Sequence, residues 1–127
     1  MTLLPLEINF EDDRGIIMDL LSKQDMNAAT LISFKKGAIR GNHFHKHTIQ
    51  YNFILKGSLR YVYQTDNGPI GEIILSTDNK SRLNFSEPWE KHAMIALEDT
   101  EMLVFTMGPR GGNDYETDTY RLETPLI

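Results

Sequence analysis

The sequence has 127 residues, which is the size of one ordinary domain. Hydrophobic residues make up 40% and charged residues 24% of the chain, which disfavours disorder. No apolar stretch approaches the roughly 18 residues that a membrane helix needs. The formal net charge of -5 disfavours a nucleic-acid partner, and the absence of cysteine excludes disulfides and thiolate metal sites. We therefore expect one cytoplasmic domain over residues 1–127, with no nucleic-acid or membrane partner.

Short segments rich in β-branched and aromatic residues follow one another, with turn residues between them, which is typical of an all-β sandwich or barrel. The clearest turn is at 66–69, where Asn67-Gly68 supplies the positive φ values of a tight hairpin. Helical periodicity is hard to find, and residues 21–27 fit either a short helix or a loop. The segment 115–122 is expected to pack over the barrel or over a neighbouring subunit. The segments expected as strands cover, in chain order, residues 6–10, 15–20, 30–35, 38–45, 50–56, 59–64, 70–76, 93–98 and 101–107.

The stretch 37–57 holds the strongest functional signal. His43 and His45 are two residues apart, so in an extended strand both side chains emerge on the same face. If the chain reverses around residues 46–49, Gln50 returns opposite the pair. The sequence therefore predicts one hairpin from which two imidazoles and a carboxamide converge. Imidazoles on an inward face are costly to bury unless a pocket or a metal ion satisfies them.

A further histidine, His92, precedes an apolar strand and follows a proline that ends the preceding segment. Its position suits a fourth inward-facing group beside the hairpin, although a lone histidine on an apolar strand also fits a core residue. Imidazoles combined with a carboxamide or carboxylate oxygen form a cage for Fe, Ni, Cu, Zn or Mn, and the sequence leaves the identity of the metal open. His47 is expected to be a solvated turn residue.

The spacing G-x5-H-x-H-x4-Q-x6-G over residues 37–57 resembles the first motif of the cupin superfamily. The second cupin motif, with Pro, Gly and His before a strand, is matched more loosely by Pro88 and His92, with Glu90 in place of glycine. The resemblance implies an all-β, single-domain cupin-type β-barrel, or jelly roll. Gln50 departs from the usual glutamate, and a neutral amide oxygen binds a divalent cation less strongly. The resemblance also implies that the metal-ligand positions are held by His43, His45, Gln50 and His92.

Residues 40–50, R-G-N-H-F-H-K-H-T-I-Q, are similar to the signature of nucleotide-sugar 3,4-ketoisomerases, which are cupins related to dTDP-4-dehydrorhamnose epimerases. Residues 13–15 and 115–121 also resemble the opening and closing segments of that family. The resemblance implies an isomerase or epimerase of surface-polysaccharide or deoxysugar biosynthesis that needs no metal. It implies His43 as the catalytic base and His45 as its partner.

The expected chemistry agrees with these residue types. Moving a carbonyl along a sugar ring, or inverting the neighbouring carbon, requires removal of a proton α to the carbonyl and its return elsewhere through an enediol. A neutral histidine suits this step as the base. Negative charge on the sugar oxygen then needs a donor, for which the candidates are Tyr61, Tyr63, a protonated histidine or a bound metal. Arg40 and Arg60 are the candidates for the substrate diphosphate, because guanidinium forks match phosphate oxygens.

Other classes of function stay open from the sequence. His92 departs from the ketoisomerase pattern, because those enzymes generally lack a histidine there, and it therefore favours a divalent-metal-binding cupin with other chemistry, such as an oxygenase. A further alternative is a non-catalytic module that binds a sugar or a metal. The expected partner is a small molecule, in the leading interpretation a nucleotide sugar. Closure of exposed sheet edges, together with the resemblance, predicts a homodimer.

Overall fold

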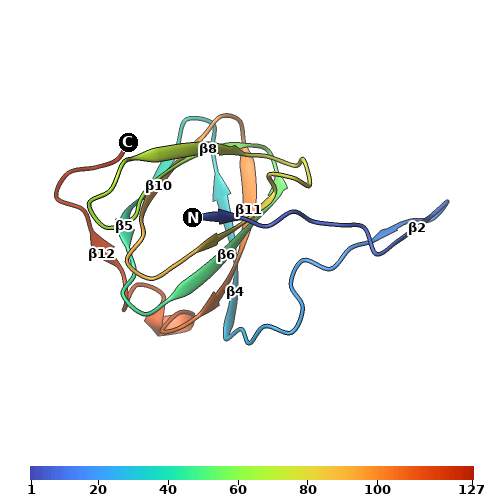
Figure 1. The fold of residues 1–127 in the computed structure, drawn as a ribbon, viewed down its shortest axis with the longest axis horizontal. Helices are drawn as coiled ribbons and strands as arrows, with labels where there is room; N and C mark the ends of the chain where they lie inside the picture. Colours follow the sequence, from blue (N-terminus) through green and yellow to red (C-terminus); the bar gives the residue numbers. More distant parts are fainter.

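The fold consists of antiparallel strands arranged in two facing sheets (Figure 1). The computed structural model describes all residues from 1 to 127. One sheet has the order β1 (Thr2–Leu3), β9 (Leu83–Ser86), β6 (Ile49–Lys56), β11 (Thr100–Met107) and β4 (Ala28–Phe34). The other has the order β12 (Tyr120–Arg121), β5 (Ile39–Phe44), β10 (Lys91–Ala96), β7 (Leu59–Gln64) and β8 (Gly71–Leu75). The sheets form a jelly-roll sandwich, so the expected all-β, cupin-type fold is confirmed.

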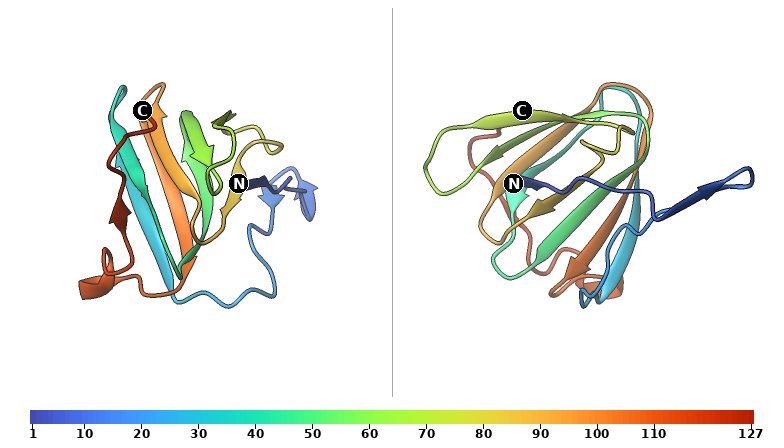
Figure 2. Two further views of the ribbon diagram at one scale, coloured as in Figure 1. Left: turned by 60° about the vertical axis from the view of Figure 1, so that its left-hand side comes forward. Right: turned by 45° about the vertical axis from the view of Figure 1, so that its right-hand side comes forward.

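Three short elements lie outside these two sheets: the hairpin of β2 (Phe10–Asp12) and β3 (Gly15–Ile17), and a 3-10 helix, η1 (Gly112–Asp114). Figures 1 and 2 show that the hairpin projects from the body of the molecule. Phe10 is 51% and Ile17 63% exposed there, so apolar side chains of this hairpin are not covered by the rest of the chain. None of the helices has the length and apolar character needed to cross a membrane.

The space between the sheets has an apolar end and a polar end. Along β6 the buried residues change from Gln50 and Asn52 to Ile54, and this change divides the interior. Asn52 donates a hydrogen bond to Asn84 of the neighbouring strand at 3.0 Å, which satisfies part of the polar end. The apolar end is the hydrophobic core, which contains Phe34, Ile54, Leu59, Tyr61, Leu75, Met94, Ala96, Met102 and Val104. Since buried polar groups need partners, the polar end is where a functional site is expected.

Most of the strands expected from the sequence are present, with small shifts of their ends. The strand expected at 6–10 is wrong, because only Phe10 belongs to a strand, and the segment 21–27 is a loop. β9 and β12 were not expected. β9 carries inward-facing polar residues in place of an apolar run, and β12 contains only two residues, so neither has a pattern long enough to identify.

The hairpin expected from residues 43–50 is also wrong, because β5 and β6 belong to different sheets. β5 pairs with β10 and β12, whereas β6 pairs with β9 and β11. The chain crosses between the sheets at 45–48, where three successive backbone N–H groups donate to the carboxylate of Asp118 at 2.8 to 3.0 Å. Gln50 therefore approaches the site from the sheet opposite His43.

A bulge in β5 changes the face toward which its side chains point. His43 is the partner of His92, and the next residue of β10 is the partner of Gly41, so Asn42 has no partner of its own. Gly41 has a φ of 91° and Asn42 a φ of 54°, and a Cβ on Gly41 would lie 2.9 Å from the backbone oxygen of His92. Because of the extra residue, Arg40 and His43 line the same cavity, although a regular strand would place them on opposite faces.

Candidate active site and metal centre

Three histidine rings meet where β5 and β10 run side by side. His43 and His92 are cross-strand partners, and His45 lies just beyond the end of β5. The ring centroids are 4.8 Å apart for His43–His45 and for His43–His92, and 5.4 Å apart for His45–His92. His45 and His92 are buried, whereas His43 is half-buried. One ring nitrogen from each lies within 4.8 Å of the others, so this histidine cluster could hold a metal ion.

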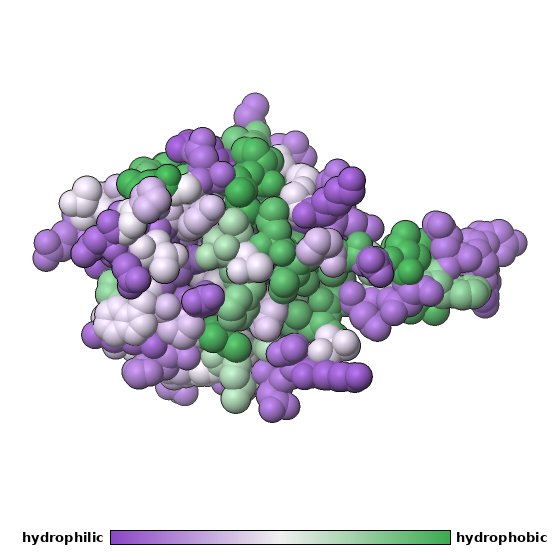
Figure 3. Space-filling model, viewed as in Figure 1, coloured by the Kyte–Doolittle hydropathy of each residue, from purple (hydrophilic) through white to green (hydrophobic).

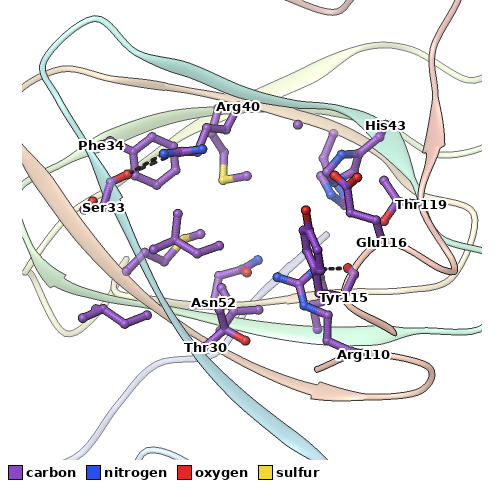
Figure 4. Close-up of a pocket in the computed structure, with 18 of the residues that line it drawn as sticks. Thr30, Ser33, Phe34, Arg40, His43, Asn52, Arg110, Tyr115, Glu116 and Thr119 are labelled. Carbon is purple, nitrogen blue, oxygen red and sulfur yellow. Dashed lines mark hydrogen bonds between the residues drawn. The ribbon is translucent and has the colours of Figure 1, made fainter. Parts of the chain in front are cut away.

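The histidine cluster borders a cavity of about 580 Å³ that both sheets and the C-terminal segment line. His43 and His92 line this cavity from one sheet, and Gln50 lines it from the other. In Figure 4, Arg110 and Tyr115 lie across the cavity from Arg40. The volume falls within the range of about 300–1,000 Å³ that is usual for small-molecule sites. Three arginines also line the cavity: Arg40, Arg110 and Arg121. Their guanidinium groups suit an anionic ligand.

The C-terminal segment determines which nitrogen of His45 carries the proton. Nδ1 of His45 lies 2.8 Å from the backbone oxygen of Asp118, and because a carbonyl only accepts hydrogen bonds, Nδ1 must be the protonated nitrogen. Nε2 of His45 is then an acceptor, and it is buried without a hydrogen-bond partner. An unpartnered buried acceptor is costly, and a metal ion or a donor group of a ligand would satisfy it.

A buried carboxylate places the proton of His92 on Nδ1, as the backbone oxygen of Asp118 does for His45. Oε2 of Glu90 accepts hydrogen bonds from the hydroxyls of Tyr61 at 2.6 Å and Ser86 at 2.8 Å, and it lies 3.5 Å from Nδ1 of His92. Burial alone would raise the pKa of Glu90, but hydrogen bonds from His92, the Met1 amino group and Tyr61 outweigh it and lower this pKa to about 2. The ionised carboxylate favours a proton on Nδ1 of His92, which leaves Nε2 of that ring as an acceptor.

At His43 the ring nitrogens have the opposite roles, because Nδ1 accepts a hydrogen bond there instead of donating one. Nη1 of Arg121 lies 3.2 Å from Nδ1 of His43, and a guanidinium can only donate. Nδ1 of the neutral ring is therefore the acceptor, and the proton of His43 is on Nε2. The histidine cluster thus combines one N–H donor with two acceptor nitrogens, which is the combination that proton transfer at a carbonyl compound requires.

The two motif histidines are uncharged at neutral pH. Burial, together with the neighbouring rings of His92 and His45, lowers the pKa of His43 to about 2. Burial and His92 also lower the pKa of His45, although the hydrogen bond to Asp118 opposes them, and the result is about 4. A neutral imidazole is the form that binds metal ions and that serves as a general base.

The arginines proposed from the sequence lie in different places. Arg40 lines the cavity, where its guanidinium donates to the backbone oxygen of Ser33 at 3.0 and 3.2 Å. Arg60 does not line it and instead forms an exposed ion pair with Glu72 at 2.8 Å. Since successive residues of β7 point to opposite faces, Arg60 and Tyr61 could not both face the cavity. The geometry gives no support to Arg60 as a diphosphate ligand.

Neither of the proposed tyrosines lines the cavity. Tyr61 is fully buried, its hydroxyl donates to Glu90, and its ring stacks on His92 with the ring centroids 5.9 Å apart. Tyr63 packs against Gly71, where a Cβ would lie 2.6 Å from the tyrosine ring. A role for Tyr61 or Tyr63 as a direct donor to the substrate therefore has no support from the geometry.

Four residues of the site were not identified from the sequence: Arg110, Arg121, Glu90 and Asp118. A signal for Glu90 was present, because Glu90 and His92 are two residues apart and can point to the same side of an extended chain. Arg110 and Asp118 lie in a loop segment without periodicity, and only the folded chain brings them to β5. No local pattern could have revealed their contacts.

Replacing Asp118 by alanine is expected to lower the free energy of unfolding by about 3 kcal/mol, because three backbone N–H groups and the Thr48 hydroxyl lose a charged acceptor. Urea unfolding followed by circular dichroism measures this change. Asp114→Ala is the matched control, because Asp114 is exposed in the same segment, and we expect it to change the stability by less than about 0.5 kcal/mol. Equal stability of the two variants would contradict a structural role for Asp118.

The two facing sheets with a histidine cluster at one end give the chain the jelly-roll fold of the cupins. Residues 10–120 match the family described as polysaccharide biosynthesis C-terminal domain, and the chain belongs to this family. Among curated proteins, none matches the sequence.

Several solved structures share this fold. QdtA, a sugar 3,4-ketoisomerase from Thermoanaerobacterium thermosaccharolyticum in complex with TDP, is 21% identical, with 96% of this chain and 88% of QdtA covered and a TM-score of 0.78. A dTDP-4-dehydrorhamnose 3,5-epimerase from Sulfolobus tokodaii is 18% identical, with 91% and 81% covered and a TM-score of 0.71. The capsular polysaccharide assembling protein CapF from Staphylococcus aureus is 23% identical, with 94% of this chain but 35% of CapF covered and a TM-score of 0.65. At these identities the likeness establishes the fold.

Proposed function

We propose that this chain is an isomerase or epimerase that transfers a proton at the carbon next to the carbonyl of a nucleotide-linked keto-sugar, in polysaccharide or deoxysugar biosynthesis. The observation that carries the proposal is the pairing of one imidazole N–H donor with two imidazole acceptors beside a cavity lined by arginines. Membership of a polysaccharide biosynthesis family and the shared fold with a ketoisomerase and an epimerase support it.

The hydrogen bonds favour a reversal of the roles expected from the sequence. In the proposed step, Nε2 of His92 removes the proton next to the carbonyl, and the electron pair of the broken C–H bond forms an enediolate. Nε2–H of His43 donates a hydrogen bond to the oxygen on which negative charge develops, as a neutral imidazole can. Protonation of the same carbon from the opposite face, by a donor other than His92 such as a water molecule, gives an epimer. Return of the proton from His92 to the former carbonyl carbon, while the proton of the neighbouring hydroxyl passes to the former carbonyl oxygen, gives an isomer. His45, which is more deeply buried than His43, supplies a further acceptor.

The diphosphate of such a substrate would be held by the arginines of the cavity. Arg110 is the best placed of them, because its Nε is buried without a hydrogen-bond partner. Arg40 and Arg121 already donate hydrogen bonds to Ser33 and His43, so they would bind phosphate with their remaining N–H groups.

The histidine cluster also fits a divalent metal ion. Its ligands would be His43, His45 and His92, with the carboxamide of Gln50 from the facing sheet, and the unpartnered Nε2 of His45 is the observation that favours this assignment. A bound Fe, Ni, Zn, Mn or Cu ion would supply Lewis acidity at the keto oxygen. This fit keeps a metal-binding cupin with other small-molecule chemistry as the second candidate function. Metal analysis of protein purified without chelators tests it, because His92→Ala should then lose most of the metal.

Incubation with a dTDP-4-keto-6-deoxyhexose in deuterated water tests the leading proposal. We expect enzyme-dependent incorporation of deuterium into the sugar ring, detected by NMR, because the abstracted proton is replaced from solvent. Absence of exchange with TDP- and UDP-linked 4-keto-sugars alike would contradict the proposal and favour a non-catalytic binding module.

We also propose that the chain works as a cytoplasmic homodimer. Figure 3 shows apolar residues in a band down the middle of one face and on the projecting hairpin. A second copy would cover these side chains, of which Phe10 and Ile17 are the most exposed in the strands of the hairpin. Sedimentation equilibrium gives the mass in solution, and a monomer at all concentrations would contradict the assembly.

A further inference from the structure

The contact between Arg121 and His43 has a consequence for metal binding. Arg121 reaches Nδ1 of His43 at 3.2 Å, and its guanidinium has donors but no acceptor. A neutral imidazole has one proton, so a ring that accepts at Nδ1 carries its proton at Nε2. A metal ion needs a lone pair, and in this tautomer Nε2 of His43 offers none. His45 and His92, whose Nδ1 atoms face acceptors, do offer a lone pair at Nε2.

The position of Arg121 is fixed by the fold. β12 pairs with β5 in a register that places Arg121 directly opposite His43. The same guanidinium forms an ion pair with Glu116 at 2.7 Å and approaches the backbone oxygen of Gly41 at 3.4 Å. In Figure 4, Glu116 lies beside His43 at the edge of the cavity. The donor is thus attached at two further points while it contacts the imidazole.

We propose that Arg121 selects the tautomer of His43 and thereby keeps the histidine cluster in a form suited to proton transfer, at the expense of its affinity for divalent metal ions. To complete a three-histidine metal site, His43 must move its proton to Nδ1 and give up the hydrogen bond from Arg121. The positive charge of Arg121 beside the site opposes the cation further. Arg121 is therefore a positioning residue that acts through His43. The inference rests on the proposed function, because it concerns the same imidazoles, but it is tested on the free protein without any sugar.

Zinc affinity of the metal-free protein tests this proposal. Arg121→Met keeps an unbranched side chain of similar reach and removes every donor, and since Arg121 is exposed, the fold should tolerate it. We expect Arg121→Met to bind Zn²⁺ about tenfold more tightly than the unmodified protein, measured by competition with a chromophoric chelator at pH 7.5. Arg110→Met is the matched control, because Arg110 also places positive charge near His43 and His45 but donates no hydrogen bond to either ring.

The control separates the tautomer from simple charge. We expect Arg110→Met to change the Zn²⁺ affinity by less than about threefold, because Arg110 contributes charge but donates no hydrogen bond to an imidazole. Equal gains in Arg121→Met and Arg110→Met would overturn the proposal, because charge alone would then explain both. Arg121→Lys keeps the charge and a donor, so its affinity should stay close to that of the unmodified protein; a tenfold gain there would also overturn it.

A second measurement observes the tautomer directly. In ¹⁵N-histidine-labelled, metal-free protein, the ¹⁵N shifts of His43 should show a proton on Nε2, whereas His45 should show it on Nδ1. In Arg121→Met the His43 signals should move toward the Nδ1-protonated form. A proton on Nδ1 of His43 in the unmodified protein would refute the inference even if sugar-dependent deuterium exchange is present. Loss of that exchange with the expected tautomers would refute only the proposed function.

Discussion

His92→Ala is expected to lower the rate of deuterium incorporation into a nucleotide-linked keto-sugar by about 10² to 10⁴-fold, because it removes the nitrogen that takes the proton. His43→Ala is expected to lower the rate by about 10² to 10³-fold, because the developing oxyanion loses its hydrogen-bond donor. The measurement is the initial rate of exchange by NMR at saturating substrate, with chelator present. The two variants remove different partners of one step, so the double variant should be little slower than the slower single variant.

The chain contains its own control for this experiment. His47 is exposed and contributes only its backbone N–H to the turn, through the bond to Asp118. His47→Ala should therefore retain the exchange rate within about twofold, as for a surface substitution away from the site. If His92→Ala exchanged as fast as His47→Ala, the proton would have to move through another group. A selective loss in His43→Ala alone would then point to His43 as the base, as the sequence suggests.

The histidine cluster could be predicted in part because its members obey simple spacing rules. His43 and His45 share a face through the two-residue period of an extended chain, and the motif spacing associates them with Gln50 and His92. Spacing alone could not reveal that His43 and His92 are cross-strand partners, because the pairing of β5 with β10 joins residues far apart in the chain. The prediction of a single hairpin failed for the same reason: pairing between neighbouring strands was assumed where the chain changes sheet.

The arginines show a second limit of reasoning from the sequence. Arg40 reaches the cavity because the bulge at Gly41 and Asn42 shifts the alternation of β5 by one residue. Gly-Asn is a signal for such a bulge, but its effect depends on the register with β10, which the sequence does not contain. Arg60 follows the regular alternation of β7 and points away from the face of Tyr61. Arg121 and Arg110 reach the site only through the pairing of β12 and the path of the C-terminal segment.

The hydrogen-bond partners of the imidazoles are the least predictable part of the site and the most informative about its chemistry. A backbone carbonyl, a carboxylate and a guanidinium face the Nδ1 atoms of His45, His92 and His43 respectively. Two of these partners come from the C-terminal segment, for which the sequence predicted only packing over the barrel or a neighbouring subunit and a resemblance to the closing segment of the ketoisomerases. If all three Nδ1 atoms faced hydrogen-bond acceptors, all three Nε2 atoms would have a free lone pair and could bind a metal ion together. The difference between a proton-transfer site and a metal site thus depends on one residue outside the motif.

Acidification from pH 7.5 to pH 5 is expected to lower the free energy of unfolding of the metal-free protein by about 4 kcal/mol. The pKa of His43 is about 2 and that of His45 about 4 in the folded protein, against an ordinary value of 6.5. Below pH 6.5 the unfolded chain takes up protons on these rings and the folded chain does not. The free energy of unfolding therefore keeps its full value above pH 6.5 and decreases as the pH is lowered below 6.5. Each ring contributes about 1.4 kcal/mol per pH unit, or about 2 kcal/mol at pH 5.

Urea unfolding at pH 7.5, 6 and 5 with chelator present measures this loss. At lower pH the loss of stability due to His45 should level off near pH 4, whereas the loss due to His43 should continue toward pH 2. Folding lowers the pKa of Glu90 from 4.5 to about 2, so Glu90 should add to the loss of stability below pH 4.5. His43→Gln should lose close to half of the change between pH 7.5 and 5, because it removes one of the two rings. A stability that does not change over this interval would mean that the rings are protonated in the folded chain as readily as in the unfolded one. Neutral imidazoles would then be lost as the physical basis of both the proton-transfer site and the metal site.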